Sequence, residues 1–139
     1  MSFGSRPTVL FLCVHNAGRS QMAAGWLGHL ARDQVVVLSG GSDPAASINP
    51  VAVEVMADAG IDIAGNSPRA WTLDEIAAAD VVVTMGCGDE CPVVSGPRYE
   101  DWELADPAGQ PIEVVRSISE DIEGRVRTLM ASLGLVATG

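Results

Sequence analysis

Three short runs of almost entirely apolar residues constrain the fold of this chain more than any other feature. They occupy residues 8–14 (TVLFLCV), 35–41 (VVVLSGG) and 80–85 (DVVVTM). A strand with one face in water alternates apolar and polar residues, whereas a strand covered on both faces is apolar throughout. We therefore expect these runs to be strands of a parallel sheet, with helices packed on both of its faces.

Helical patterns lie between these strands. Residues 19 to about 31 place their apolar side chains on one stripe, as an amphipathic helix does. Asn49 and Pro50 are typical of the cap and the first position of a second helix. Thr72 and Glu75 have the spacing of a capping box and begin a short third helix.

The last third of the chain adds one strand and one long helix. Residues 99–104 are predicted to be a short strand, and apolar residues at three- and four-residue steps predict a helix from residue 112 to about 133. Right-handed connections turn this order of elements into an α/β fold, a three-layer sandwich with a central four-stranded parallel sheet. We expect residues 1–139 to form a single domain of this kind, since a chain of this length fits one core.

Charge and hydropathy exclude several classes of partner. Eight basic and 18 acidic residues give a net charge of −10, which repels nucleic-acid backbones and anionic lipid surfaces. No segment approaches the roughly 18 consecutive apolar residues of a membrane span. The N-terminal apolar run carries the most informative motif of the chain, so we do not read it as a cleaved signal peptide. We therefore expect a cytoplasmic protein that binds neither nucleic acid nor membrane.

The first apolar run leads into a short polar loop, CVHNAGRS, which begins at Cys13. A short loop between a strand and a helix directs backbone amides inward and forms a nest for an anion. Gly18 permits a backbone angle that a side chain would oppose. Arg19 can bind two oxygens of a tetrahedral anion with its planar guanidinium. The loop therefore predicts a site for a tetrahedral oxyanion.

The same groups act on the sulfur of Cys13. An arginine and a helix N-terminus both stabilise a thiolate, and the hydroxyl of Ser20 can donate a hydrogen bond to it. The alternative is a buried, inert cysteine beside a solvated arginine. Because a strand precedes the loop, a helix follows it and Gly18 lies within it, we expect Cys13 to be a nucleophile.

Asp106, in the sequence DPAG, follows the predicted last strand and should lie at the same edge of the sheet as Cys13. Its carboxyl can supply the proton that a departing oxygen needs, although Asp-Pro also begins ordinary turns. His15 is expected on the outer side of the loop, because the inward groups should be amides.

The three cysteines, Cys13, Cys87 and Cys91, are too few for a secreted disulfide scaffold and favour reactive thiols in a reducing compartment. Together with His15 they could supply four zinc ligands, but Cys13 and His15 would have to meet a loop that is remote in sequence. We therefore expect no metal and no bound cofactor, and a zinc- or metalloid-binding module is the third hypothesis.

The loop CVHNAGRS resembles the catalytic loop of the low-molecular-weight protein tyrosine phosphatase fold. The segments CVHNAGRSQMAAGW, SINP and WELADPAGQ together resemble the arsenate reductase branch of that fold, and the resemblance extends over residues 8 to about 133. RSQMA and DPAG favour the reductases, because phosphatases of this size tend to have a proline after the serine and an aromatic residue after Asp-Pro. The resemblance implies an arsenate reductase or arsenate–thiol transferase of arsenical detoxification, and a protein tyrosine phosphatase is the alternative.

The resemblance also implies a role for each residue of the site. Cys13 would attack arsenate, Ser20 would stabilise the thiolate, and Asp106 would protonate the departing oxygen. The arsenate oxygens would be bound by the loop residues Val14, His15, Asn16, Ala17, Gly18, Arg19 and Ser20.

Two regions depart from the family pattern. Ala24 stands where some reductases have an acidic residue that helps to bind potassium, so we expect no such ion. Cys87 and Cys91, in MGCGDECP, have three residues between them, fewer than the two resolving cysteines of thioredoxin-coupled members.

This spacing leaves the reducing thiol open. In one scheme Cys87 attacks the Cys13 adduct, Cys91 resolves Cys87, and thioredoxin reduces the last disulfide. In the other, a small thiol such as mycothiol (with mycoredoxin) or glutathione attacks the adduct directly, and both cysteines are bystanders. The form MGCGDECP favours mycothiol.

Overall fold

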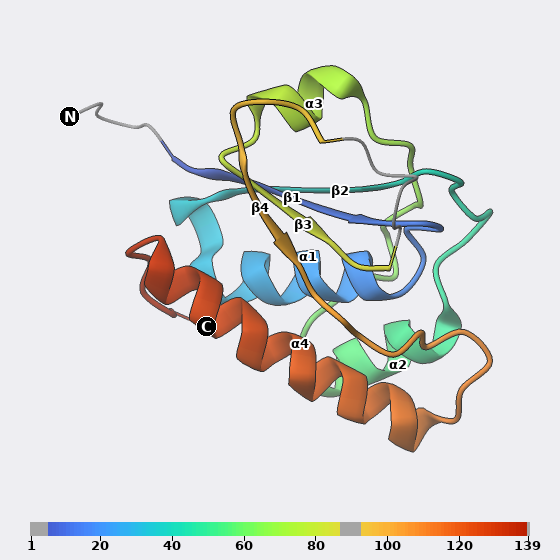
Figure 1. Cartoon of the computed structure of the whole chain (residues 1–139). Coiled ribbons are helices and arrows are strands. Elements are labelled where there is room, and N and C mark those ends of the chain that lie inside the picture. Colours follow the sequence, from blue (N-terminus) through green and yellow to red (C-terminus); the bar gives the residue numbers. More distant parts are fainter. Residues whose placement is uncertain (1–5, 87–92, 139) are drawn as a thin grey trace.

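The computed structural model describes residues 6–86 and 93–138, and its centre is a parallel sheet (Figure 1). The strand order is β2-β1-β3-β4, and every neighbouring pair is parallel. The strands are β1 (Thr8–Cys13), β2 (Val36–Gly41), β3 (Val81–Thr84) and β4 (Arg98–Asp101). The four-stranded parallel sheet of the sequence-based prediction is confirmed.

Helices cover both faces of this sheet and complete three layers (Figure 1). Within residues 6–86 and 93–138, α3 (Leu73–Ala78) is the only helix on one face. The other face carries α1 (Arg19–Ala31), α2 (Pro50–Asp58) and α4 (Ile112–Ser132), and a short 3-10 turn, η1 (Arg32–Gln34), follows α1. Among the described residues, no helix has the length and apolar character needed to cross a membrane.

Strand β1 shows why its sequence is apolar at every position after Thr8. Phe11 and Cys13 belong to the larger core cluster, under α1, α2 and α4, whereas Leu10 and Leu12 belong to the smaller cluster, under α3. All four side chains are buried. Burying one Leu or Phe side chain contributes about 1.5–3 kcal/mol, so both faces of β1 stabilise the fold.

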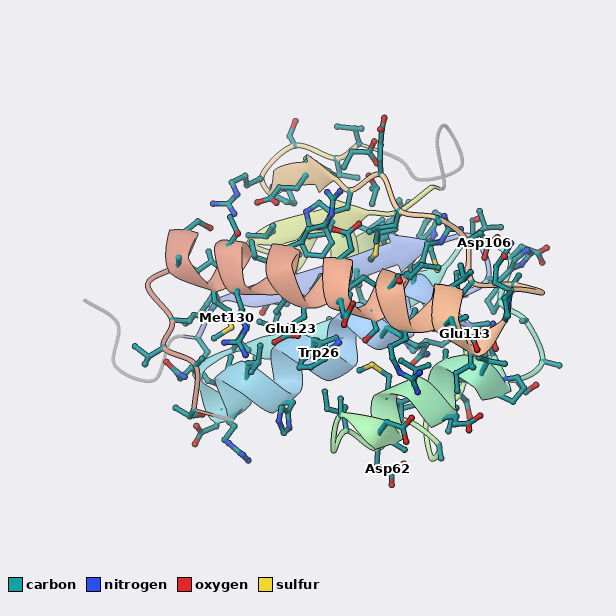
Figure 2. The ribbon with its side chains drawn as sticks, turned by 90° about the horizontal axis from the view of Figure 1, so that it is seen from below. Trp26, Asp62, Asp106, Glu113, Glu123 and Met130 are labelled. Atoms are coloured by element: carbon teal, nitrogen blue, oxygen red, sulfur yellow. The ribbon has the colours of Figure 1, made fainter. Side chains whose placement is uncertain are left out.

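Helix α4 packs across α1, and Trp26 lies at their contact (Figure 2). The indole nitrogen of Trp26 donates a hydrogen bond to Ser119 Oγ of α4 at 3.0 Å. The Ser119 hydroxyl in turn lies 3.7 Å from the sulfur of Met56 in α2. The polar atoms buried between the three helices are therefore paired, as a stable core requires.

The predicted helix starts of α2 and α3 are confirmed. Asn49 Oδ1 accepts hydrogen bonds from the backbone N–H groups of Val51 and Ala52, at 2.9 and 3.4 Å. Thr72 and Glu75 form the complete capping box at the start of α3, each side chain accepting from the other residue's backbone N–H.

Strand β4 begins one residue before the predicted 99–104 segment and ends three residues earlier. The backbone N–H of Trp102 still donates to the Thr84 carbonyl at 2.9 Å, and the chain then leaves the sheet. Two residues later the Leu104 carbonyl accepts a hydrogen bond from Arg19 at 3.3 Å. The apolar side chains of Trp102 and Leu104 both pack against the core, although the ladder ends at Trp102, which is why their pattern suggested a longer strand.

The strand order determines where a ligand can bind. From β1 the chain passes first to β2 on one side and later to β3 on the other. In open parallel sheets the connections diverge at such a point and leave a crevice at the carboxyl ends of the strands. Cys13 is the last residue of β1 and lies at this crevice.

Candidate active site

A small cavity opens beyond the carboxyl end of β1. Its volume is about 70 Å³, well below the roughly 300–1,000 Å³ of pockets that hold drug-sized ligands. It therefore suits a compact ligand such as a tetrahedral anion. Two segments supply most of its lining, which consists of Cys13, His15, Ala17, Gly18, Arg19, Asn49, Asp106, Pro107 and Ala108.

The sulfur of Cys13 is surrounded by hydrogen-bond donors. Ser20 Oγ lies 2.8 Å from Cys13 Sγ and accepts a hydrogen bond from Asn16 Nδ2 at 2.7 Å. A hydroxyl has one proton and two acceptor sites, so Ser20 Oγ can accept from Asn16 and also donate its proton to Cys13 Sγ when that sulfur is ionised. The backbone N–H of Asn16 also donates to Cys13 Sγ, at 3.2 Å. A thiolate at this position would therefore accept from the Asn16 amide and from the Ser20 hydroxyl, the arrangement that an anionic sulfur needs.

Asn16 is the centre of a buried polar network. Its side chain is fully buried, and its φ of 51° is a left-handed conformation that Asn tolerates better than most residues. Its Oδ1 accepts from Gln21 Nε2 at 3.1 Å and from the Arg69 backbone N–H at 3.0 Å. Gln21 Oε1 accepts in turn from Asn66 Nδ2 at 3.3 Å. The loop is therefore fixed from behind by the 66–69 segment.

Arg19 spans the two sides of the cavity. Its guanidinium donates to the Leu104 carbonyl at 3.3 Å and lies 3.7 Å from Asp106 Oδ2. Gly86, after β3, makes room for it: a Cβ added there would lie 2.7 Å from Arg19 Nη1. The side chain is only 14% exposed, so its charge is concentrated at the cavity.

Gly18 lets the two sides of the cavity approach each other. A Cβ added at Gly18 would lie 2.6 Å from Pro107 Cγ, so any side chain would displace that proline. The φ of Gly18 is −137°, and the left-handed angle of the loop belongs to Asn16 instead. The close approach of Pro107 is therefore a requirement for glycine at position 18 that sequence reasoning did not identify.

Asp106 lies at the mouth of the cavity, at the end of the molecule where α4 begins (Figure 2). Its Oδ1 accepts from the Ala108 backbone N–H at 3.0 Å, which closes an Asx turn around Pro107. The side chain is 56% exposed, so this carboxyl can exchange protons with water while facing the cavity.

The structure thus brings together four of the residues singled out from the sequence: Cys13, Arg19, Ser20 and Asp106. The His15 side chain is exposed, with Nδ1 3.0 Å from the Asp43 carbonyl, but residue 15 also lines the cavity, so its place on the outer side of the loop stays a prediction. The carbonyl of Val14 also accepts from the Asp43 backbone N–H, at 2.8 Å. Anion binding by the amides of Val14, His15, Asn16, Ala17, Gly18 and Ser20 stays a prediction.

Cys87 and Cys91 lie outside the described residues, and so does any contact that they make. Within the described ranges, no three His, Cys, Asp or Glu side chains gather closely enough to hold a metal ion. The zinc hypothesis depends on the two cysteines beyond those ranges and is therefore not tested.

Sequence reasoning missed several residues that support the site. Gln21 and Asn66 fix Asn16, and Gly86 makes room for Arg19. Asn49 was identified only as a helix cap, although it also lines the cavity. One signal was available in the sequence. Two polar residues, Ser20 and Gln21, follow Arg19 at the start of a helix whose other buried side chains are apolar.

Comparison with known proteins places these features in a family context. The model of the family "low molecular weight phosphotyrosine protein phosphatase" matches residues 8–136. A putative arsenate reductase of Halobacterium salinarum is 40% identical over 131 residues, which cover 91% of this chain and 92% of that protein. A glutaredoxin arsenate reductase of Synechocystis is 35% identical over 128 residues, covering 90% of this chain and 97% of that protein.

A solved structure is also similar to this chain in both fold and sequence. The thioredoxin-dependent arsenate reductase of Corynebacterium glutamicum superposes with a TM-score of 0.84 at 44% identity. The match covers 96% of this chain and 64% of that protein, so this chain spans somewhat less than two thirds of its length.

Proposed function

Because the chain belongs to the low-molecular-weight phosphotyrosine protein phosphatase family, we propose that it is an arsenate reductase in which Cys13 attacks arsenate. One observation carries this proposal. The sulfur of Cys13 accepts from the Asn16 amide and contacts Ser20 Oγ, at a cavity that Arg19 and Asp106 also line. Such a cavity holds a nucleophile, a cation and an acid around space for one small anion.

Arsenate binding must be a local effect in this protein. The net charge of −10 opposes the approach of an anion. Arg19 supplies a fixed positive charge at the cavity, and the amides of residues 14–20 with the N-terminus of α1 add their partial positive charges. Arg19 can hold two arsenate oxygens, which orients the arsenic toward the sulfur of Cys13.

The first step joins sulfur to arsenic. The Cys13 thiolate attacks, the bond between arsenic and one of its hydroxyl groups breaks, and this departing hydroxyl takes the proton of the Asp106 carboxyl and leaves as water. Arsenic stays pentavalent in this adduct. Asp106 then recovers a proton from solvent, to which it is exposed.

The two electrons that reduce arsenic come from two thiols. If a thiolate attacks the sulfur of Cys13, an S–S bond forms and the electron pair of the S–As bond passes to arsenic, which leaves as arsenite. If a small thiol attacks arsenic instead, the product is an arsenate–thiol conjugate, and reduction follows when a second thiol attacks that conjugate. In both routes the reductant is a thiol and no metal or bound cofactor takes part.

The proposal also includes the thiol system that supplies the electrons. The motif MGCGDECP favours mycothiol with mycoredoxin, whereas the relatives named above are called thioredoxin-dependent and glutaredoxin arsenate reductases. Cys87 and Cys91 are the candidate resolving cysteines of a thioredoxin route. We place the reaction in the cytoplasm, where thiols stay reduced, with the chain acting as a single domain.

Turnover of arsenate with mycothiol plus mycoredoxin, and separately with thioredoxin and its reductase, tests the proposal. Activity with either system supports it, and inactivity with both, and with glutathione plus glutaredoxin, contradicts it. Cys87→Ser and Cys91→Ser, assayed one at a time, assign the donor. Both variants lose turnover if the thioredoxin route operates, and both keep it if a small thiol attacks the adduct directly.

A phosphatase acting on phosphotyrosine is the second candidate, favoured by the description of the matching family. The lining of the cavity counts against it, because among the described residues no Phe, Tyr or Trp lines the mouth to stack on a phenol ring. Brisk hydrolysis of an aryl phosphate, lost in Cys13→Ser and not matched by arsenate turnover, would favour the phosphatase.

A further inference from the structure

Asn49 connects three segments that meet at the cavity. Its Oδ1 accepts from the backbone N–H groups of Val51 and Ala52 and caps helix α2. Its own backbone N–H donates to the Ala17 carbonyl, in the catalytic loop (residues 13–20), at 2.8 Å. Its Nδ2 donates to the Pro107 carbonyl at 3.3 Å. Pro107 belongs to the segment that carries Asp106, which we call the acid loop (residues 103–110).

Capping explains only part of this arrangement. A cap needs an acceptor on a short side chain, and Asp or Ser supplies one about as well as Asn. Of these three side chains, only the Asn amide adds an N–H donor, at Nδ2. It reaches a carbonyl 58 residues away in the chain, on the residue that follows Asp106.

Other contacts hold the Asp106 side chain only loosely. The carboxylate is more than half exposed, and its closest approach to Arg19 is 3.7 Å. The hydrogen bond from Ala108 fixes the turn internally but does not attach it to the rest of the protein. At the start of the acid loop the Leu104 and Glu103 carbonyls accept from Arg19 and Arg125, at 3.3 and 3.1 Å. Next to Asp106 the attachment comes from Pro107, which is buried, packs on Gly18, and receives the Asn49 hydrogen bond.

We propose that Asn49 is a positioning residue for the general acid: its side-chain amide holds the Pro107 carbonyl, and through it sets Asp106 over the anion in the catalytic loop. This inference rests on the proposed function, which gives Asp106 its role as the acid. Asn49 also lines the cavity, so direct contact with the anion is the competing explanation that the test must exclude.

Two substitutions separate the donor from the cap. Asn49→Asp keeps an acceptor at the start of α2, where the helix dipole favours a negative charge, but it cannot donate. Asn49→Ser keeps a neutral cap whose hydroxyl is too short to reach Pro107. We expect both variants to lower kcat for arsenate about tenfold, since small misplacements of reacting groups are costly, and to change KM less than twofold. A loss in Asn49→Asp alone would indicate a charge effect on the anion and would overturn the proposal.

A double-mutant cycle with Asp106→Asn shows whether Asn49 acts through the acid. If it does, Asn49→Ser lowers kcat about tenfold in the wild-type protein and less than twofold when Asp106 is already Asn, since the two residues act as one unit. An equal loss in both backgrounds would mean that Asn49 acts on the anion or on Cys13, and the inference would be wrong.

Amide hydrogen exchange tests the placement of the acid loop without any turnover. We expect exchange at Ala108 and Gln110, whose amides donate within the loop, to be several-fold faster in Asn49→Ser. Ala64 donates to Asp62 Oδ1 in the same type of turn elsewhere, and its exchange should not change. If the wild-type protein fails to reduce arsenate, the proposed function falls, and exchange still decides whether Asn49 holds the loop. Unchanged exchange at Ala108 and Gln110 would overturn the inference.

Discussion

The two loops that form the cavity differ in how firmly they are held. In the catalytic loop, Asn16 and Ser20 are buried and each is hydrogen-bonded on more than one side. In the acid loop, Asp106 is 56% exposed, and the loop is attached through its neighbours: Pro107 is buried, and the Glu103 and Leu104 carbonyls accept from Arg125 and Arg19. The difference corresponds to two chemical tasks. A nucleophile needs fixed donors and no water, whereas an acid that is used once per turnover must regain its proton from solvent.

The largest loss of arsenate turnover should follow from removing the nucleophile in the catalytic loop. Cys13→Ser keeps nearly the same volume in a buried position, so the fold should survive, but we expect arsenate turnover to fall by roughly 10⁴-fold or more. Steady-state assays with each thiol system measure this. Residual activity near that of the wild-type protein would place the nucleophile elsewhere.

Removing the acid should lower arsenate turnover less than removing the nucleophile does. We expect Asp106→Asn to lower kcat by about 10²-fold, the lower end of what general acids contribute, and to change the melting temperature little because the side chain is exposed. Asp62→Asn is the matched control, since Asp62 is an exposed aspartate in an equivalent turn, with Ala64 as the donor. Equal effects of the two substitutions would argue against a proton-transfer role for Asp106.

Within the catalytic loop, Ser20→Ala tests the donor to the sulfur. We expect the alkylation rate of Cys13 at pH 6, which in the wild-type protein should exceed that of a free thiol, to fall about tenfold. The variant also leaves Asn16 Nδ2 without its acceptor, at a cost of about 1–3 kcal/mol in stability. Ser119→Ala, at another buried hydroxyl with two partners, should be destabilising too but leave Cys13 labelling unchanged. Peptide mass spectrometry follows Cys13 separately from Cys87 and Cys91.

The smallest effect concerns the contact between the loops. A methyl group at position 18 would overlap Pro107 Cγ, so Gly18→Ala should push the acid loop outward and lower kcat about threefold. Gly28→Ala, on α1 with nothing within 4 Å of the added atom, should leave kcat unchanged and raise stability by up to about 1 kcal/mol. If Gly18→Ala has wild-type activity and stability, the two loops tolerate separation and their contact has no function.

The sheet could be predicted because a strand buried on both faces has a nearly continuous run of apolar residues in its sequence. The runs that contain Leu10 and Val82 are almost entirely apolar and correspond to β1 and β3. Strand β4 was misjudged in length because the ladder ends with the hydrogen bond of the Trp102 amide, whereas the Trp102 and Leu104 side chains both pack against the core. The sequence shows that such side chains are buried, but not whether the backbone beside them is still paired.

The centre of the site could be predicted because strand, loop and helix follow each other within a few residues. Cys13, Arg19 and Ser20 belong to this local unit, and Asp106 was found from its place after the last strand. The supporting contacts could not be predicted in this way. Asn16 receives the Arg69 backbone N–H across 53 positions, and Arg19 lies over Gly86. Such pairings depend on the finished fold and leave no local pattern in a single sequence.

The hydrogen bonds around Cys13 have a consequence for the end of the reaction cycle. The free enzyme is regenerated only when the bond between Cys13 and arsenic breaks. In the small-thiol route the sulfur of Cys13 is the leaving group of that step. Donors that stabilise a sulfur anion before attack stabilise it equally on departure, and better-stabilised thiolates leave faster. The Asn16 amide and the Ser20 hydroxyl should therefore shorten the lifetime of the covalent intermediate, so that little of the enzyme accumulates in the arsenylated form.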